Sequence, residues 1–576
     1  MSIEFVQRRF PWIMAPTQWL SNLLTPERWP FLPASVASWI TRHIAVDTTS
    51  AGRALRQANL LDRVRDMALP RKPALRSLDW RVRKLFWTMQ WCVMVVFQGW
   101  PRRAPMPRRE PPIRLLSAPE TYADFQAPTL VVPDGVPYAE KSLLNQLTVQ
   151  LVHLMQDVYP LVTSQQAPAD PDRQVRFDRA YTFAYRCVRD APRWHPDLVA
   201  AAASRNLLGA LAAGGPFAKL LQRVDGEPSE YVIDLSHFTN YRVHEGLCQL
   251  GSRIHFSAPD GRLKVTGIEY EQERITPDSG KWDLAERIAV AGLMTHVTVW
   301  RQGMEYHVGG LAPVPVLTHN LLPPAHPLRR LLAPHINQTM TTNFHTHLTL
   351  RRSGFDVTGF AFPYDTILRY YDDGAASFDI NRLDVEQDAR RRGIPDSLDY
   401  PYLAQASRYY RLFDAYVRQY VGHYYPSDAA VASDPDISAW FEALDRHIVH
   451  GVRSYVPELN RDNLIRLCTL LIYSLTVGHN ENSLLNYGMF MPTTVRRDGV
   501  QPSVGEIQNI VNFQFLITAP TTLLVSDVAH LALDEKAAEI MRGFHRSLLA
   551  LQDEMERQPD RYWQLFPNQV EASVSC

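Results

Sequence analysis

The chain has 576 residues, and its 60 Lys and Arg balance 60 Asp and Glu, so the formal net charge is zero. A hydrophobic fraction of 46% and a charged fraction of 21% are typical of a globular protein, and the length predicts one large domain with a smaller one. Zero net charge argues against nucleic acid as a partner. Five scattered cysteines without C-x-x-C spacing argue against a disulfide framework and against a zinc–thiolate site.

Residues 1–115 are rich in Trp, Arg and Pro, and we expect them to form a helical N-terminal extension. The first ten residues carry Glu4, Arg8 and Arg9, and prolines follow closely, which is not the pattern of a secretory signal peptide. The expected location is therefore cytoplasmic. Residues 116–576 are expected to form the main domain.

One segment of the extension, residues 85–100, is apolar and aromatic and has arginines on both sides. It is too short to span a bilayer comfortably. One interpretation is a helix on a membrane surface, with aromatic side chains at the interface and arginines on the phosphates. The other interpretation, which we favour, is a buried helix docked on the main domain.

Apolar spacing in the main domain is mostly helical. The predicted helical segments are 141–160, 197–222, 282–306, 328–350, 407–425, 435–454, 463–490 and 531–555. Residues 230–268 differ, because they alternate and contain the turn Asp260-Gly261 between two strand-like runs. The sequence predicts a mainly α fold with a small β-hairpin subdomain.

The segment 468–492 carries the strongest local signal for a site. It begins as an uncharged apolar run, delivers His479, and then turns polar with three asparagines and Glu481. A buried helix that ends this way either holds a functional site or simply leaves the core with a capped histidine. The segment alone favours the second interpretation.

Seven motifs, taken in order, together resemble the lipoxygenase family. They are Y-V-I-D-L at 231–235, D-G-R-L-K-V-T-G-I-E-Y at 260–270, W-D-L-A-E at 282–286, H-P-L-R-R-L-L-A-P-H at 326–335, R-R-G-I-P-D at 391–396, D-Y-P-Y at 399–402 and Y-V-x-x-Y-V-x-x-Y-Y-P-S-D at 416–428. Each motif is weak alone, but their order is that of the family. The resemblance implies a large lipoxygenase-like helical bundle, and the family's N-terminal β-sandwich is absent from the pattern.

The resemblance also implies a non-haem iron held by three histidines, a fourth side chain and the carboxylate of the last residue. His479 matches the third histidine, and Ser483, one turn later, stands at the fourth-ligand position. The terminal residue here is Cys576, whose α-carboxylate would bind. Imidazole and carboxylate suit iron, whereas the hydroxyl of Ser483 is a poor ligand.

The first ligand helix departs from the family pattern H-x-x-x-x-H. Counting from Trp282 without gaps, the two ligand positions fall on Val297 and Gln302, and His307 matches a non-ligand histidine. A one-residue slip brings His296 to the first position but Arg301 to the second. The family brings its pair together with a π-type turn. We expect His479, Cys576, His296 and Ser483 to be the metal ligands, with Gln302 as a further candidate.

The resemblance implies an apolar, elongated substrate such as a polyunsaturated fatty acid, with Leu328, Leu331 and Leu332 beside it. The expected function is a lipoxygenase-like non-haem iron dioxygenase. Two alternatives stay open because the first histidine pair is lost: a non-catalytic lipid or partner binder, and a metal-independent enzyme that reuses the pocket. Peripheral membrane contact through 85–100 would bring the protein to its lipid.

Overall fold

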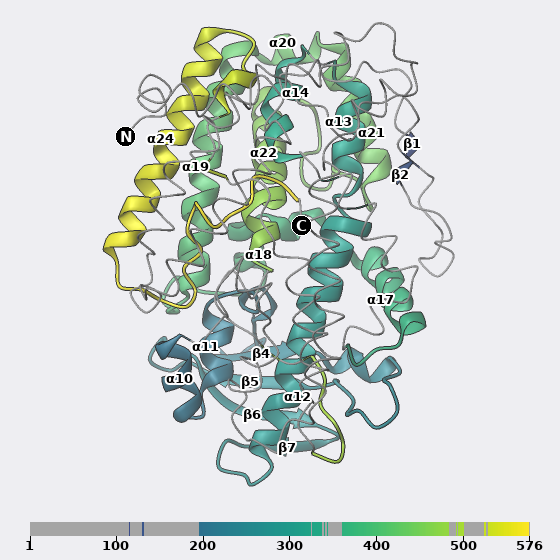
Figure 1. The fold of residues 1–576 in the computed structure, drawn as a ribbon, viewed down its shortest axis with the longest axis vertical. Helices are drawn as coiled ribbons and strands as arrows, with labels where there is room; N and C mark the ends of the chain where they lie inside the picture. The colour runs from purple at the N-terminus through teal and green to yellow at the C-terminus, as the bar shows by residue number, and fades with distance from the viewer. Residues whose placement is uncertain are drawn as a thin grey trace, which may run out of the picture.

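The computed structural model describes residues 114–115, 130–131, 195–323, 325–336, 339, 343, 360–482, 491, 493–499, 524–525 and 528–574. The predicted segments 85–100 and 141–160 lie outside these ranges, as do most of 1–115 and the end of 463–490. Figure 1 shows the described part as a small sheet at one end of the long axis and a helical body above it.

The sheet has five antiparallel strands in the order β3-β4-β5-β6-β7. Its strands are β3 (Gln222–Arg223), β4 (Glu230–Asp234), β5 (Arg253–Ser257), β6 (Lys264–Tyr270) and β7 (Glu273–Ile275), and a separate two-stranded pair joins β1 (Arg114–Leu115) to β2 (Leu130–Val131). Tyr231 faces Phe256 and Ile233 faces Ile254 across β4 and β5. These four side chains are buried, which is the half-buried alternation that the sequence predicts. The expected hairpin is confirmed and proves to be part of a larger sheet.

Two short helices occupy the segment 197–222, where the sequence has helical apolar spacing. These are α10 (Pro196–Ala203) and α11 (Leu207–Ala213), and the short 3₁₀ helix η3 (Ala218–Leu220) leads into β3. Arg205 has a φ of 54°, a left-handed conformation that ends a helix. The predicted helical structure is therefore present, with a break at Arg205.

The helical body follows in chain order. Its helices are α12 (Trp282–Thr295), α13 (Pro313–Leu321), α14 (Pro327–Leu332), α17 (Tyr364–Ser377), α18 (Val385–Arg391), α19 (Pro401–Tyr424), α20 (Asp428–Ala432), α21 (Pro435–His447), α22 (Arg461–Tyr473) and α24 (Glu535–Arg557). Shorter 3₁₀ helices are η4 (Ser236–Asn240), η6 (Ala333–His335), η7 (Ile380–Leu383) and η10 (Ala529–Leu531). Helix α19 packs against both α22 and α24. The described residues contain no β-sandwich, and the mainly α fold is confirmed.

Two of the long helices change into π-helices near the middle of the molecule. Helix α12 continues as η5 (His296–Val308), and α22 continues as η8 (Ser474–Gly478). The chain beyond α24 then returns into the helical body (Figure 1). Val570, Ser573 and Val574 are completely buried there. Both π-helices and this C-terminal segment therefore reach the core.

Candidate functional site

The π-helix η5 determines which side chains face the core. A π-helix has i→i+5 hydrogen bonds, so residues five apart lie nearly on one face. Val297, Gln302 and His307 are spaced by five, and all three are buried. Gly303 lets η5 lie close to α17, because a Cβ there would lie 2.4 Å from the Tyr371 hydroxyl. A regular α-helix would turn Gln302 and His307 well apart.

Three polar side chains from the two π-helical regions converge. The Nε2 atom of His479 lies 2.6 Å from Nε2 of Gln302 and 3.3 Å from Nε2 of His307. The two imidazole rings meet edge to face with centroids 5.2 Å apart. All three side chains are at most 3% exposed. A polar site therefore lies inside the core. His479 is part of it, at the end of the apolar run 468–478 that the sequence predicts to be buried.

The other nitrogen of each imidazole has different surroundings. Nδ1 of His307 lies 3.1 Å from Oδ1 of Asn343, whereas Nδ1 of His479 lies 4.0 Å from a carboxylate oxygen of Glu571, beyond hydrogen-bonding distance. The C-terminal segment is fixed at this place, since Asn480 accepts a hydrogen bond from the Glu571 backbone N–H at 3.2 Å. The contact with Asn343 therefore orients the ring of His307, and the carboxylate of Glu571 lies near that of His479.

Electrostatics keeps His479 neutral. Burial, followed by repulsion from His307, lowers the pKa of His479 well below its ordinary value. A neutral imidazole offers a lone pair that can accept a proton or bind a metal.

Charged side chains lie directly behind the three polar ones. Arg301 forms an ion pair with Glu305 at 3.3 Å, and Lys219 forms one with Glu481 at 3.2 Å. Each of these two buried cations therefore has an acidic partner. Burial alone would lower the pKa of Arg301, but attraction to Glu305 raises it.

The predicted ligand His296 lies in a different cluster. Its Nδ1 is 2.6 Å from the Tyr370 hydroxyl, which His237 also approaches at 3.4 Å, and its ring stacks on Trp300. His296 begins the π-helix six residues before Gln302, so it points to another side of η5. Its polar and ring contacts in the described part of the chain are with this cluster and not with His479, and its role as a ligand stays a prediction that this placement does not favour.

The remaining predicted residues fall in two groups. Ser483 and Cys576 lie outside the described residues, although the chain is described up to Asn482 and Val574 on either side of the site. Leu328, Leu331 and Leu332 are on α14 and completely buried in the core. Their contact with substrate remains a prediction.

Sequence reasoning missed His307, Asn343 and Glu571 as members of the site. The available signal was the five-residue spacing from Gln302 to His307. Had the π-type turn been extended by one further step, His307 would have been placed beside Gln302. No sequence signal pointed to Asn343 or Glu571, because both reach the site from distant segments.

Another cluster with metal-binding side chains occurs among the described residues, comprising His326, Asp434 and Asp436. Its groups serve as helix caps. His326 accepts from the Leu328 N–H at the start of α14, and Asp434 accepts from the N–H groups of Asp436 and Ile437 at the start of α21. These capping hydrogen bonds account for the positions of His326 and Asp434, and this cluster needs no ion to explain it.

Comparisons with known proteins agree with this architecture. The family model described as Lipoxygenase matches residues 278–497. The mouse arachidonate 12-lipoxygenase, 12R-type, is 24% identical over 288 residues, which are 44% of this chain and 40% of that protein. The potato linoleate 13S-lipoxygenase 3-1, chloroplastic, is 32% identical over 270 residues, which are 41% of this chain and 29% of that protein. The chain therefore spans less than half the length of these relatives.

Solved structures share the fold. A coral 8R-lipoxygenase superposes with a TM-score of 0.65 at 15% identity over 80% of this chain and 77% of that one. A calcium-dependent 11R-lipoxygenase superposes with a TM-score of 0.64 at 16% identity over 76% and 74%.

These features define a class of mainly helical proteins in which two π-helices and a buried C-terminal segment enclose a polar site. The chain is similar to the lipoxygenase family over residues 278–497 and shares the fold of solved lipoxygenases. It departs from the family pattern in the site, since Val297 and Gln302 stand where the resemblance implies two histidines.

The described residues fit a metal ion through an altered donor set. Two ligands at right angles on bonds of about 2.1 Å lie about 3 Å apart, and the distances of 2.6 and 3.3 Å from Nε2 of His479 to Gln302 and His307 lie on either side of that value. Oε1 of Gln302 is buried and has no hydrogen-bond partner among the described residues. A half-turn of the amide would exchange Oε1, which can bind a cation, with Nε2. Val297 supplies no donor.

Proposed function

We propose that the protein is a lipoxygenase-type dioxygenase that uses non-haem iron and acts on a polyunsaturated fatty acid or a similar apolar substrate. The observation that carries the proposal is that Gln302 and His307 approach Nε2 of His479 at 2.6 and 3.3 Å inside the core. An imidazole whose second nitrogen is held by a hydrogen-bond partner, as His307 is by Asn343, is typical of a metal ligand. Imidazole nitrogen also suits iron among the divalent metals.

In this proposal Gln302, His307 and His479 hold the ion, and Ser483 and the carboxylate of Cys576 remain further candidate ligands. When bound, the iron supplies the one-electron chemistry that activates the substrate toward oxygen. The protein orients the ion through Asn343, which fixes His307, and through Glu571, which faces His479. The surrounding apolar core excludes water and favours an apolar substrate, with Leu328, Leu331 and Leu332 proposed to lie beside it.

Iron content and oxygen uptake test the proposal. We expect about one equivalent of iron in protein purified from iron-supplemented cells. Oxygen uptake is expected with polyunsaturated fatty acids and not with the saturated acid of equal chain length. Protein that retains no iron and takes up no oxygen with any acid of the panel would contradict the proposal.

One observation favours a second candidate function. The protein would then bind lipid without a metal, or act as an enzyme that reuses the pocket. The amide of Gln302 lies 2.6 Å from His479, so His479 has a hydrogen-bond partner without any ion. This candidate predicts binding of a fluorescent fatty acid that chelators leave unchanged. Loss of fatty-acid binding after iron removal would instead support the metal-dependent function.

A further inference from the structure

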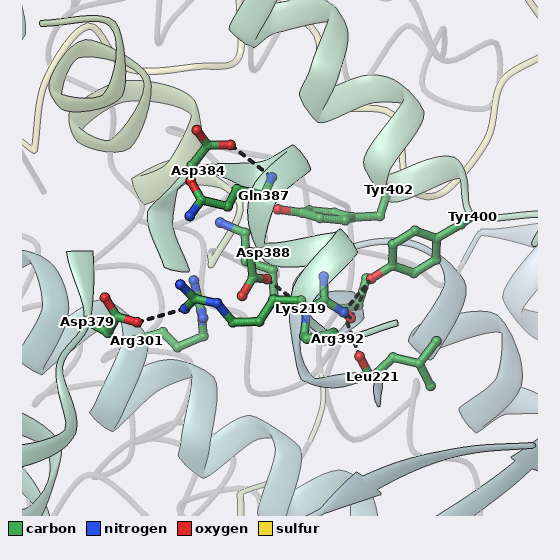
Figure 2. A network of polar contacts seen from close by, with 12 residues as sticks. Lys219, Leu221, Arg301, Asp379, Asp384, Gln387, Asp388, Arg392, Tyr400 and Tyr402 are labelled. Carbon is green, nitrogen blue, oxygen red and sulfur yellow. Dashed lines mark hydrogen bonds and ion pairs between the residues drawn. The ribbon is translucent and has the colours of Figure 1, made fainter. Parts of the chain in front are cut away.

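Four buried charged side chains surround the back of the site. Lys219, Arg301, Glu305 and Glu481 are 8%, 6%, 6% and 2% exposed. Two positive and two negative charges make this charge cluster formally neutral. Figure 2 shows Lys219 lying close to Arg301, with Tyr402 across from it.

The charge cluster joins the two π-helical regions. Glu481 accepts hydrogen bonds from the hydroxyls of Tyr473 at 2.6 Å and Tyr402 at 3.0 Å, in addition to its ion pair with Lys219. Arg301 donates through Nε to Oδ1 of Asn482 at 3.2 Å, and Asn482 in turn donates to the carbonyl of Gly478 at 3.0 Å.

The cluster residues alternate along the chain with those of the polar site. Arg301 and Glu305 bracket Gln302 on η5, and Glu481 follows His479 by two residues. A shift of either π-helix by one residue would therefore break the cluster and turn the polar side chains away from each other. The cluster and the site thus depend on the same helical register.

Lys219 reaches the cluster from the 3₁₀ helix η3, whose backbone is held by hydrogen bonds. Arg392 donates through Nη1 to the carbonyl of Leu221 at 2.6 Å, and the Tyr400 hydroxyl donates to the carbonyl of Ala218 at 2.6 Å (Figure 2). Arg392 is itself held by Asp388 at 2.7 Å. The carbonyls on either side of Lys219 are fixed, so its ammonium group is presented to Glu481 with little freedom.

Stability alone does not explain such a cluster. Replacing a buried ion pair by apolar residues of similar volume is often neutral or stabilising, and the best-attested role of buried polar groups is to fix register. A π-helix needs such a device, because it carries extra residues relative to an α-helix and is rarely favoured by itself. We propose that the charge cluster sets the π-helical register of η5 and η8, and that Lys219 and Arg301 are positioning residues for Gln302, His307 and His479.

The double variant Lys219→Met with Glu481→Gln tests this inference. Of its two measurements, metal binding rests on the proposed function, and hydrogen exchange does not. Both changes are made together because a lone buried charge would be strongly destabilising. The exposed pair Lys536–Glu539 provides the matched control, Lys536→Met with Glu539→Gln. We expect the test variant to melt close to the wild type, to bind Co²⁺ about tenfold or more weakly, and to show a changed absorption spectrum of the bound ion.

Hydrogen exchange in the metal-free protein tests the register independently. Peptides that cover 296–308 and 474–482 are expected to exchange about tenfold faster or more in the test variant, while peptides from α24 stay unchanged. Unchanged exchange in both π-helices would overturn the inference, as would Co²⁺ binding with wild-type affinity and spectrum. If the wild type binds no metal, the proposed function fails, and the exchange rates alone then test whether the charge cluster sets the π-helical register.

Discussion

At the scale of single residues, the site is defined by which side chains meet His479. Gln302 and His307 meet it, whereas His296 forms its own cluster with Tyr370. A histidine count or a motif match could not distinguish His307 from His296, because both lie on the same π-helix, η5. Their different surroundings lead to different expectations for substitution.

Removing a converging imidazole should remove metal binding. We expect His479→Ala and His307→Ala to lower the affinity for Fe²⁺ or Co²⁺ by about tenfold or more, because each deletes one nitrogen donor. His296→Ala is the control and should keep wild-type affinity. Metal titration followed by absorption measures all three. Equal loss in the His296→Ala variant would place the ligands where the sequence predicts them and contradict the site described above.

His335 should make the protein less stable as the pH falls. Burial lowers the pKa of His335 to about 4, despite its hydrogen bond to the carbonyl of Ala572. Below pH 6.5 His335 binds a proton in the unfolded chain but stays neutral in the folded one. The free energy of unfolding therefore falls between pH 6.5 and 4. From pH 7 to 5 we expect the wild type to lose roughly 2 kcal/mol more than His335→Gln. Urea unfolding at both pH values measures this, and parallel losses would contradict it.

At the scale of elements, the helices that carry the site depend on local signals and on one close approach. Helix α22 begins with Asn460, whose side chain accepts from the Asn463 N–H at 2.9 Å. The π-helix η5 depends on Gly303, which allows contact with α17. The first is a cap that sequence patterns predict, and the second appears only when two helices pack.

Loss of the cap should weaken the helix that delivers His479. Asn460→Ala removes the acceptor for one of the first free N–H groups of α22, and we expect a decrease of about 1 kcal/mol in the free energy of unfolding. Asn460→Asp keeps an acceptor and should stay within about 0.5 kcal/mol of the wild type. Chemical denaturation compares them. A similar decrease in both variants would show that the cap does not matter.

Two glycine substitutions should act in opposite directions. Gly303→Ala would place its Cβ against the ring and hydroxyl of Tyr371, and we expect a loss of about 1–3 kcal/mol. Gly422→Ala, in α19, meets no atom within 4 Å and should gain about 0.5–1 kcal/mol, because alanine favours a helix. Thermal unfolding of the two variants tests the contrast, and a stable Gly303→Ala protein would refute the close packing.

At the scale of the whole molecule, the described part is one helical body with a sheet at its end, and it shares the fold of a solved coral lipoxygenase. No described helix combines the length and hydropathy needed to cross a bilayer. The N-terminal extension 1–115, its boundary with 116–576, and a cytoplasmic location with peripheral membrane contact through 85–100 stay predictions. They concern how the protein reaches an apolar substrate.

Membrane contact by the extension predicts a simple result. The full chain should co-sediment with liposomes that contain anionic lipid, because arginines flank the aromatic segment 85–100. A protein without residues 1–115 should stay in the supernatant while keeping its circular dichroism spectrum. Equal sedimentation of the two proteins would exclude membrane contact through this extension.

The sequence by itself indicated the fold class, the resemblance to the lipoxygenase family and the place of His479 in a buried helix. Alternation and helical spacing are local properties, and the order of seven motifs survives even where single residues diverge. The capping of α14 by His326 was predictable for the same reason, because an N-cap involves only neighbours along the chain.

Only the tertiary structure decided what surrounds His479. A π-helix rotates every later side chain relative to an α-helix, so the face of His307 could not be read from α-helical spacing. Asn343 and Glu571 come from segments 36 and 92 residues away from their partners, and no local rule connects them. Likewise, Lys219 and Glu481 form their ion pair only when η3 packs against the residues that follow η8. The fold could therefore be predicted from the sequence. Which side chains meet at the site depends on helical register and on packing between segments that are distant in the chain.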